Sequence, residues 1–162
     1  LTFEEKVKLA EAVVDEVGGK VDVIVNAGMP ATFETIKLAK EFDRIGVTAI
    51  AVITPFFIAC TQDGLIRHFS TVADAVKTPT YLYDIPARTQ NHIEPETARK
   101  LAAHGNIAGI KDSGGSTETV LLRLDKPRHY DFLFLGSSHT HYMMQSINHP
   151  MYEDSLGKSI AT

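Results

Sequence analysis

The chain has 162 residues, of which 44% are hydrophobic and 22% are charged, and this is the length and composition of one ordinary globular domain. Its formal net charge of -4 argues against nucleic acid or an anionic membrane surface as the main partner. The single cysteine, Cys60, excludes an intramolecular disulfide and a thiolate metal cluster, and with no long apolar run it leads us to expect a cytoplasmic protein.

The first half of the chain alternates amphipathic helices with short apolar strands. Thr2 and Glu5 have the spacing of a capping box, and Thr32 is placed to cap the second helix. Glycines follow both helices, at Gly18 and Gly46, where they favour a helix end. The predicted elements are a helix to about Val17, a strand over 21–28, a helix over 32–45 and a strand over 47–55.

The second half continues the alternation. Pro95 suits the first turn of a helix, and Pro86 closes a strand. Met143 and Met144 are placed in a further helix, and the pattern fades beyond Pro150. The predicted elements are helices over 62–76, 95–104 and 116–124, and strands over 78–86, 106–112 and 131–138.

The five predicted strands are almost continuously apolar and show no hairpin signal between them. Such strands are typical of a parallel sheet that is covered on both faces by crossover helices. Two architectures fit, a doubly wound open sheet and part of an eight-stranded βα barrel. A glycine-rich dinucleotide fingerprint and a phosphate loop are both absent, which favours the barrel and disfavours a nucleotide-binding module.

Ligands bind at the carboxyl ends of the strands in either architecture, and three residues there could carry chemistry. The amine of Lys111 could form a Schiff base, Tyr83 could move a proton, and the guanidinium of Arg88 suits a carboxylate. Each also has an ordinary explanation: a solvated lysine, a core aromatic, and a loop arginine paired with a neighbour such as Asp84. His139 and His141 lack a third ligand, so we expect surface histidines, no metal site and no cofactor.

Three short sequence motifs, taken together, favour the functional explanation of these residues over the ordinary one. ITPFF (53–57), YDIPART (83–89) and GIKDSGG (109–115), in this order and at this spacing, resemble the dihydrodipicolinate synthase/N-acetylneuraminate lyase family. The resemblance covers about residues 1–138. It implies a (β/α)8 TIM barrel of pyruvate-dependent class I aldolases. The chain would then be one partial barrel domain over 1–162, covering about strands 3 to 7, with a poorly matched tail over 150–162.

The resemblance also implies roles for single residues. Lys111 matches the lysine that condenses with the keto carbon of pyruvate or a 2-keto acid, and Tyr83 matches the tyrosine that relays protons. Arg88 matches an arginine that holds the tyrosine and the incoming carboxylate. Thr54 matches the threonine of the family's Thr-Pro strand end. We expect it on the substrate-binding side of the site, in a more structural role. The implied partners are pyruvate, an aldehyde and further copies of the chain, often in a tetramer.

The chain departs from the family pattern at several places. Phe57 stands where synthases usually have a tyrosine that reaches a neighbouring subunit's site, and Gln90 stands where the family has glycine. The Gly-Thr-Thr-Gly-Glu loop that binds the pyruvate carboxylate is missing, so we expect a piece of a longer barrel. The resemblance leaves three functions open: a 4-hydroxy-tetrahydrodipicolinate synthase, a 2-keto-3-deoxy sugar-acid aldolase, or a non-catalytic relative that binds keto acids or serves as a structural subunit.

Overall fold

The structure, a computed structural model, describes residues 1–114, 133–138 and 141–146. The predicted helix over 116–124, His139 and the segment beyond Pro150 lie outside these residues. In chain order the elements are α1 (Phe3–Val17), β1 (Ile24–Asn26), α2 (Thr32–Ile45), β2 (Ala49–Ile53), α3 (Gln62–Asp74), β3 (Thr80–Asp84), α4 (Pro86–Thr89), α5 (Pro95–Ala102), β4 (Ile107–Asp112), β5 (Leu133–Ser138) and β6 (His141–Ser146). Within the described ranges, no helix combines the length and apolar character needed to cross a membrane.

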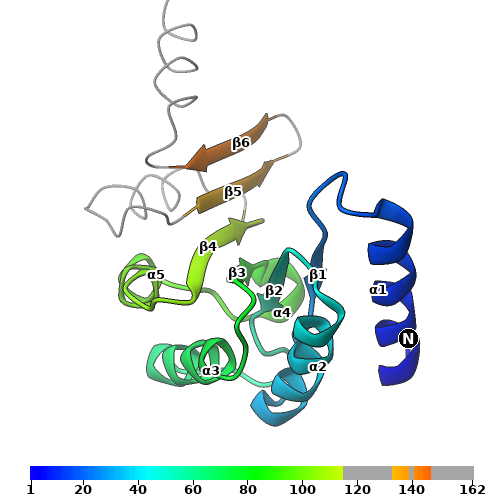
Figure 1. Ribbon diagram of the computed structural model, residues 1–162. Helices are drawn as coiled ribbons and strands as arrows, with labels where there is room; N and C mark the ends of the chain where they lie inside the picture. Colours follow the sequence, from blue (N-terminus) through cyan, green and yellow to red (C-terminus); the bar gives the residue numbers. More distant parts are fainter. Residues whose placement is uncertain (115–132, 139–140, 147–162) are drawn as a thin grey trace, which may run out of the picture.

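The strands form one sheet in which the spatial order is the chain order, β1-β2-β3-β4-β5-β6. Strands β1 to β5 pair with one another in parallel, as the alternating pattern predicts. Helices α2, α3 and α5 lie along one face of the sheet, and α1 lies beside its β1 edge (Figure 1). Consecutive parallel strands joined by helices on the same side are the repeating unit of a βα barrel.

The expectation of a helix after β5 is wrong. Met143 and Met144 lie in strand β6 rather than in a helix, and β6 runs antiparallel to β5. Only residues 139–140 separate the two strands, and so short a connection permits a hairpin but no crossover. The connecting residues carry none of the usual Asn-Gly or Asp-Gly signals, which is why the sequence did not indicate a hairpin.

Most predicted helix ends are confirmed. Thr2 and Glu5 form the capping box, and Gly18 and Gly46 end α1 and α2 in left-handed conformations with φ of 54° and 86°. Thr32, however, is not the cap of α2, because Ala31 precedes the helix and makes no side-chain cap bond. Its hydroxyl is instead 2.9 Å from His68 Nδ1 on α3.

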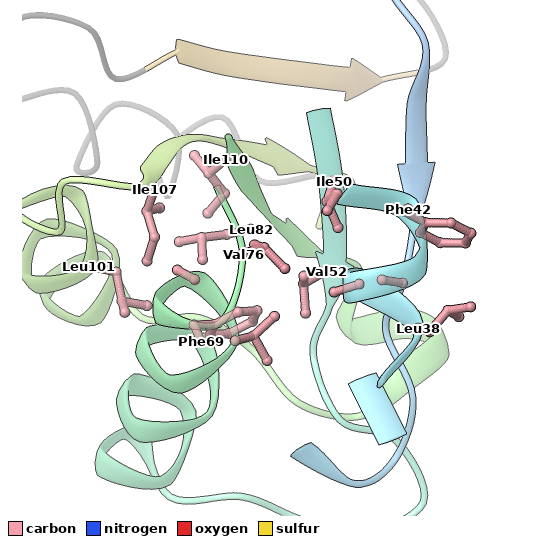
Figure 2. Close-up of a cluster of buried hydrophobic side chains, with 14 of the residues drawn as sticks. Leu38, Phe42, Ile50, Val52, Phe69, Val76, Leu82, Leu101, Ile107 and Ile110 are labelled. Atoms are coloured by element: carbon pink, nitrogen blue, oxygen red, sulfur yellow. The ribbon is translucent and has the colours of Figure 1, made fainter. Parts of the chain in front are cut away.

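A hydrophobic cluster fills the layer between the sheet and its helices (Figure 2). Its largest members are less than 2% exposed, and each such side chain stabilises the fold by roughly 1.5–3 kcal/mol. Strand β2 contributes the alternate residues Ile50 and Val52, so the residues between them face the other side of the sheet. In β4 the cluster residues Ile107 and Ile110 are separated by a register shift in the pairing with β3. The buried set includes Ile50, Val52, Leu82 and Ile110 from the strands and Leu38, Phe42, Phe69 and Leu101 from the helices.

The opposite face of the sheet is the inner face of the barrel architecture, and its side chains are more accessible. In β3, Leu82 is fully buried against the helices, whereas Tyr81 and Tyr83 are half-buried on the inner face. In β4, Ile110 is fully buried and Lys111 is half-buried. The inner face therefore combines polar side chains with access, which is where a binding site can form.

The connection from β1 to α2 passes close to the end of β2. Asn26 Oδ1 accepts hydrogen bonds from the backbone N–H groups of Gly28, at 3.0 Å, and Ile53, at 3.2 Å. A Cβ on Gly28 would meet Ile53 Cγ2 and would lie 2.8 Å from Ile53 N. The carboxyl end of β2 thus requires glycine at position 28.

We expect Gly28→Ala to lower the free energy of unfolding by about 1–3 kcal/mol, because backbone atoms must move to admit the methyl group. Gly105→Ala is the matched control, since a Cβ there meets no atom within 4 Å. Urea unfolding of both variants is the measurement. Equal stabilities would contradict the close approach of Gly28 to Ile53.

His68 is a buried neutral histidine between α2 and α3. Its Nδ1 pairs with the Thr32 hydroxyl, and its buried Nε2 has no hydrogen-bond partner in the described part of the chain. Burial lowers the pKa of His68 from its ordinary value of 6.5 to about 4. Between these two pH values the unfolded chain holds the proton more readily than the folded one, so stability falls as the pH falls.

The free energy of unfolding should therefore drop by about 2 kcal/mol between pH 7 and pH 5 from this group alone. His68→Gln, which does not titrate, should remove that part of the dependence. Urea titrations of the two proteins at both pH values give the comparison. Identical pH slopes would show that His68 is not the group responsible.

Candidate functional site

The register between β3 and β4 brings two predicted site residues together. Tyr83 pairs with Lys111, and Asp84 pairs with Asp112. Because side chains opposite each other on neighbouring strands share a face, Tyr83 and Lys111 both project from the inner face. Lys111 Nζ lies 4.3 Å from the centre of the Tyr83 ring. An amine and a phenol therefore meet at the carboxyl end of two parallel strands.

This contact places a positive charge over the negative face of an aromatic ring. Such cation–π pairs are worth about 0.5–1 kcal/mol at exposed sites and more where water is excluded. Lys111 lies in a strand whose helix side is buried, and its own side chain is half-buried. The structure thus places Lys111 within β4 rather than beyond its end.

Arg88 lies in α4, the short helix that follows Tyr83. Pro86 begins this helix at its first position, and the sequence did not predict a helix there. The side chain of Arg88 is exposed, and it forms no ion pair with the described residues. Asp84, the neighbour suggested by the sequence, is fully buried and instead lies 2.9 Å from His92 Nδ1. Arg88 thus lies on the short helix that follows β3, with its side chain exposed.

Thr54 lies at the end of β2 with its side chain fully buried. Its backbone N–H donates to the Tyr83 carbonyl at 3.2 Å, and its hydroxyl donates to Thr89 Oγ1 at 2.8 Å. Thr54 therefore joins the end of β2 to β3 and to α4. The geometry gives Thr54 a bracing role next to Tyr83, and its part in substrate binding stays a prediction.

Asn91 is a residue that the sequence reasoning did not single out. It is 4% exposed, and its side-chain amide bonds to three backbone groups of the turn that follows β2. Asn91 Nδ2 donates to the carbonyls of Pro55, at 2.7 Å, and Ile58, at 2.8 Å, and Asn91 Oδ1 accepts from the N–H of Cys60 at 2.8 Å. No motif signals this role, because it depends on two loops about 35 residues apart.

A metal site and an apolar groove are the two other features that could have marked a functional site. In the described ranges, no group of three His, Cys, Asp or Glu side chains is placed to hold a metal ion. A groove of about 380 Å³ runs between α1 and β1, and its lining is largely apolar, with residues such as Leu9, Val13 and Ile24. This groove does not include Lys111, Tyr83 or Arg88. The chemistry-bearing residues are gathered at the carboxyl ends of β3 and β4 instead.

Comparison with known proteins agrees with this geometry. The profile of the dihydrodipicolinate synthetase family matches residues 1–147. The 4-hydroxy-tetrahydrodipicolinate synthase of Acidothermus cellulolyticus is 42% identical over 127 residues, which cover 76% of this chain and 41% of that protein. The corresponding enzyme of Alkaliphilus oremlandii is 39% identical over 120 residues, covering 74% of this chain and 41% of that protein. The chain thus spans less than half the length of these relatives.

Solved structures show the same relation. A dihydrodipicolinate synthase from Bacillus anthracis superposes with a TM-score of 0.82 at 33% identity, covering 85% of this chain and 47% of that one. A prophage protein of the dihydrodipicolinic acid synthase family from E. coli K12, solved in complex with pyruvate, has a TM-score of 0.80 at 33% identity with the same coverage. The chain belongs to the dihydrodipicolinate synthetase family, and its parallel strands form part of that family's (β/α)8 TIM barrel.

Proposed function

We propose that this chain belongs to a Schiff-base-forming lyase or aldolase that acts on pyruvate or another 2-keto acid. The observation that carries the proposal is the amine of Lys111, held 4.3 Å from the Tyr83 ring centre at the carboxyl end of β4. The family relation supports it, as do the relatives named 4-hydroxy-tetrahydrodipicolinate synthase and the family structures solved with pyruvate.

Lys111 would act as the nucleophile. Its neutral amine adds to the keto carbon, and the resulting carbinolamine loses water to give an iminium ion. Loss of a proton from the adjacent methyl group then gives an enamine, which can attack the carbonyl carbon of an aldehyde. Water finally hydrolyses the new iminium and releases Lys111. The same steps in reverse cleave a carbon–carbon bond.

Tyr83 would serve this sequence in two ways. Its hydroxyl can deliver and accept the protons that carbinolamine dehydration and hydrolysis require. Its ring face lies beneath Lys111 Nζ, so it would also lie beneath the positive charge of an iminium formed there. The exposed guanidinium of Arg88 is suited to a substrate carboxylate, and Thr54 would hold the adjoining backbone in place.

Two reactions fit these roles. The names of the relatives favour condensation of the kind carried out by 4-hydroxy-tetrahydrodipicolinate synthases. Phe57 favours a 2-keto-3-deoxy sugar-acid aldolase, because a phenyl ring cannot pass a proton where synthases usually have tyrosine. We further propose a homo-oligomer, as the family resemblance implies, and a cytoplasmic location, as the single cysteine leads us to expect. A non-catalytic relative that binds keto acids is the competing proposal.

Incubation of the whole protein with pyruvate and borohydride should leave a reduced adduct on Lys111, located by peptide mass spectrometry. Lys111→Ala should abolish the adduct. Lys111→Arg should also abolish it while keeping a positive charge over Tyr83, which separates nucleophilicity from charge. Lys100→Ala, at an exposed lysine on α5, is the matched control and should react normally. An adduct that persists in both Lys111 variants would refute the role, and no adduct on well-folded wild type would favour the non-catalytic relative.

Tyr83→Phe should keep the ring beneath Lys111 but remove the proton donor. We expect kcat to fall by roughly 10²–10⁴-fold, as for loss of a general acid–base group, with a much smaller change in KM. Tyr81→Phe, two residues earlier on the same face of the same strand, is the matched control. Steady-state kinetics of the two variants measures whether the Tyr83 hydroxyl takes part in proton transfer. Equal rates would remove Tyr83 from the proton relay.

A further inference from the structure

Asn26, the last residue of β1, projects from the inner face of the sheet. It pairs with Ala51 on β2, and the residues on either side of Ala51, Ile50 and Val52, are fully buried on the helix side. Side chains alternate between the two faces of a strand, and paired residues of neighbouring strands share a face. The side chain of Asn26 therefore lies on the same face as the candidate site.

Two hydrogen bonds determine which way the amide of Asn26 points. Its Oδ1 accepts from the backbone N–H groups of Gly28, at 3.0 Å, and Ile53, at 3.2 Å. Because both partners are donors, the oxygen must face them, and the Nδ2 group must face away from them. Asn26 is exposed, and its Nδ2 donates to no other group in the described part of the chain. Two N–H donors are therefore left without a partner from these residues at the end of β1.

The register of the sheet places this amide level with the candidate site. Ile53, whose N–H binds Asn26, pairs with Tyr83, and Tyr83 pairs with Lys111. Neighbouring strands are about 4.8 Å apart, so β1 lies roughly 10 Å from β3 along the sheet. Lys111 Nζ lies over the ring of Tyr83, which belongs to β3. A three-carbon keto acid bonded to this amine is too short to span the two strand spacings to β1, whereas an added aldehyde lengthens the ligand.

The chemistry of a neutral amide limits what it can recognise at this place. Its free N–H groups can bind a hydroxyl or carbonyl oxygen, but they bring no positive charge to a carboxylate, which the guanidinium of Arg88 suits better. The strand end itself does not need these donors, because the carboxylate of an aspartate could accept the same two backbone bonds. The Nδ2 group of Asn26 is therefore the part of the side chain that the fold leaves unexplained.

We propose that Asn26 is a specificity-determining residue whose Nδ2 group donates a hydrogen bond to a hydroxyl oxygen of the aldehyde substrate. This inference rests on the proposed function and deepens it, because it assigns hydroxylated aldehydes as the acceptor class. Lys111 and Tyr83 act on the keto acid, and Asn26 contacts the carbon chain that is joined to it. The competing explanation is a structural role alone, in which Asn26 only ends the pairing of β1 with β2.

The test uses the whole protein and two aldehydes of equal length, D-glyceraldehyde, which carries hydroxyl groups, and propionaldehyde, which does not. The readout is kcat/KM for each aldehyde with pyruvate as the co-substrate. Asn26→Ala removes the oxygen and the donors together. Asn26→Asp keeps an oxygen for the N–H groups of Gly28 and Ile53 but has no donor at neutral pH. Borohydride trapping of the adduct with pyruvate alone measures the first step separately.

Asn106→Ala is the matched control, because Asn106 is an asparagine whose amide serves only the fold at the amino ends of the strands. Its Nδ2 donates to the carbonyls of Ala73, Val76 and Thr78. We expect this variant to be less stable than wild type but to keep the same ratio of kcat/KM between the two aldehydes.

Asn26→Ala should lower kcat/KM for D-glyceraldehyde on the order of tenfold and leave that for propionaldehyde nearly unchanged, because only the first aldehyde loses a hydrogen bond. Asn26→Asp should lose the same selectivity, and it provides the comparison if the alanine variant does not fold. Formation of the pyruvate adduct should stay at the wild-type level in both variants, since the keto acid does not reach Asn26.

Equal losses for the two aldehydes in Asn26→Ala would show a structural role and overturn the proposal. It would also fail if Asn26→Asp kept the wild-type selectivity, if the pyruvate adduct were lost together with turnover, or if wild type formed the adduct but used neither aldehyde. These outcomes leave the proposed function standing, since the adduct on wild type supports it. If wild type forms no adduct, the proposed function fails and the role of Asn26 fails with it.

Discussion

The register between β3 and β4 is the constraint on which the site depends. A slip of one residue would send Tyr83 and Lys111 to opposite faces of the sheet. The hydrophobic layer prevents this slip, because Leu82 and Ile110, the register partners one residue earlier, are fully buried on the helix side. The Ser113 N–H donates to the Asp84 carbonyl at 2.8 Å and continues the pairing beyond the site. Core packing therefore determines the contact between the amine and the phenol.

Buried polar side chains at the two ends of the strands bind different kinds of backbone group. At the amino ends, Asn106 caps backbone carbonyls, and Asp43 Oδ1 accepts hydrogen bonds from Lys77 N and from the backbone and hydroxyl of Thr78. The Thr78 hydroxyl bond is the main cause that lowers the pKa of Asp43. At the carboxyl ends, Thr54 and Asn91 hold loops rather than helix ends. The described bonds thus hold the amino ends of the strands to helix ends, and the carboxyl ends to neighbouring loops.

The sequence predicted those features that depend on local pattern. Strand β4 and its terminal Lys111 follow from a continuous apolar run, and the ends of α1 and α2 follow from Gly18 and Gly46. The roles of the strand-end residues came from resemblance, since each residue alone had an ordinary explanation. Strand β6 was missed because its pairing depends on β5 and a two-residue connection rather than on its own composition.

The polar contacts between loops were beyond the reach of the sequence for a different reason. Thr32 has the residue type of a helix cap, yet its hydroxyl is 2.9 Å from His68 Nδ1, which lies 36 residues away. Asn91 resembles any loop asparagine until the turn over 55–60 is placed against it. An asparagine amide has two donors and an acceptor that can satisfy many different backbone groups. The residue type therefore does not specify the partner, and only the folded arrangement does.

The departures from the family pattern coincide with the strained backbone. The family has glycine where Gln90 stands, and Gln90 adopts a φ of 60°, a conformation that glycine reaches without steric cost. A glutamine there must be held by its surroundings, and the adjoining Thr89 and Asn91 are both buried and hydrogen-bonded. Phe57, the other departure, is strained as well, although it is 91% exposed and packs against little. Packing within this chain therefore does not explain the conformation of Phe57. The family pattern, in which this position reaches a neighbouring subunit's site, indicates that the contacts of the ring lie outside this chain.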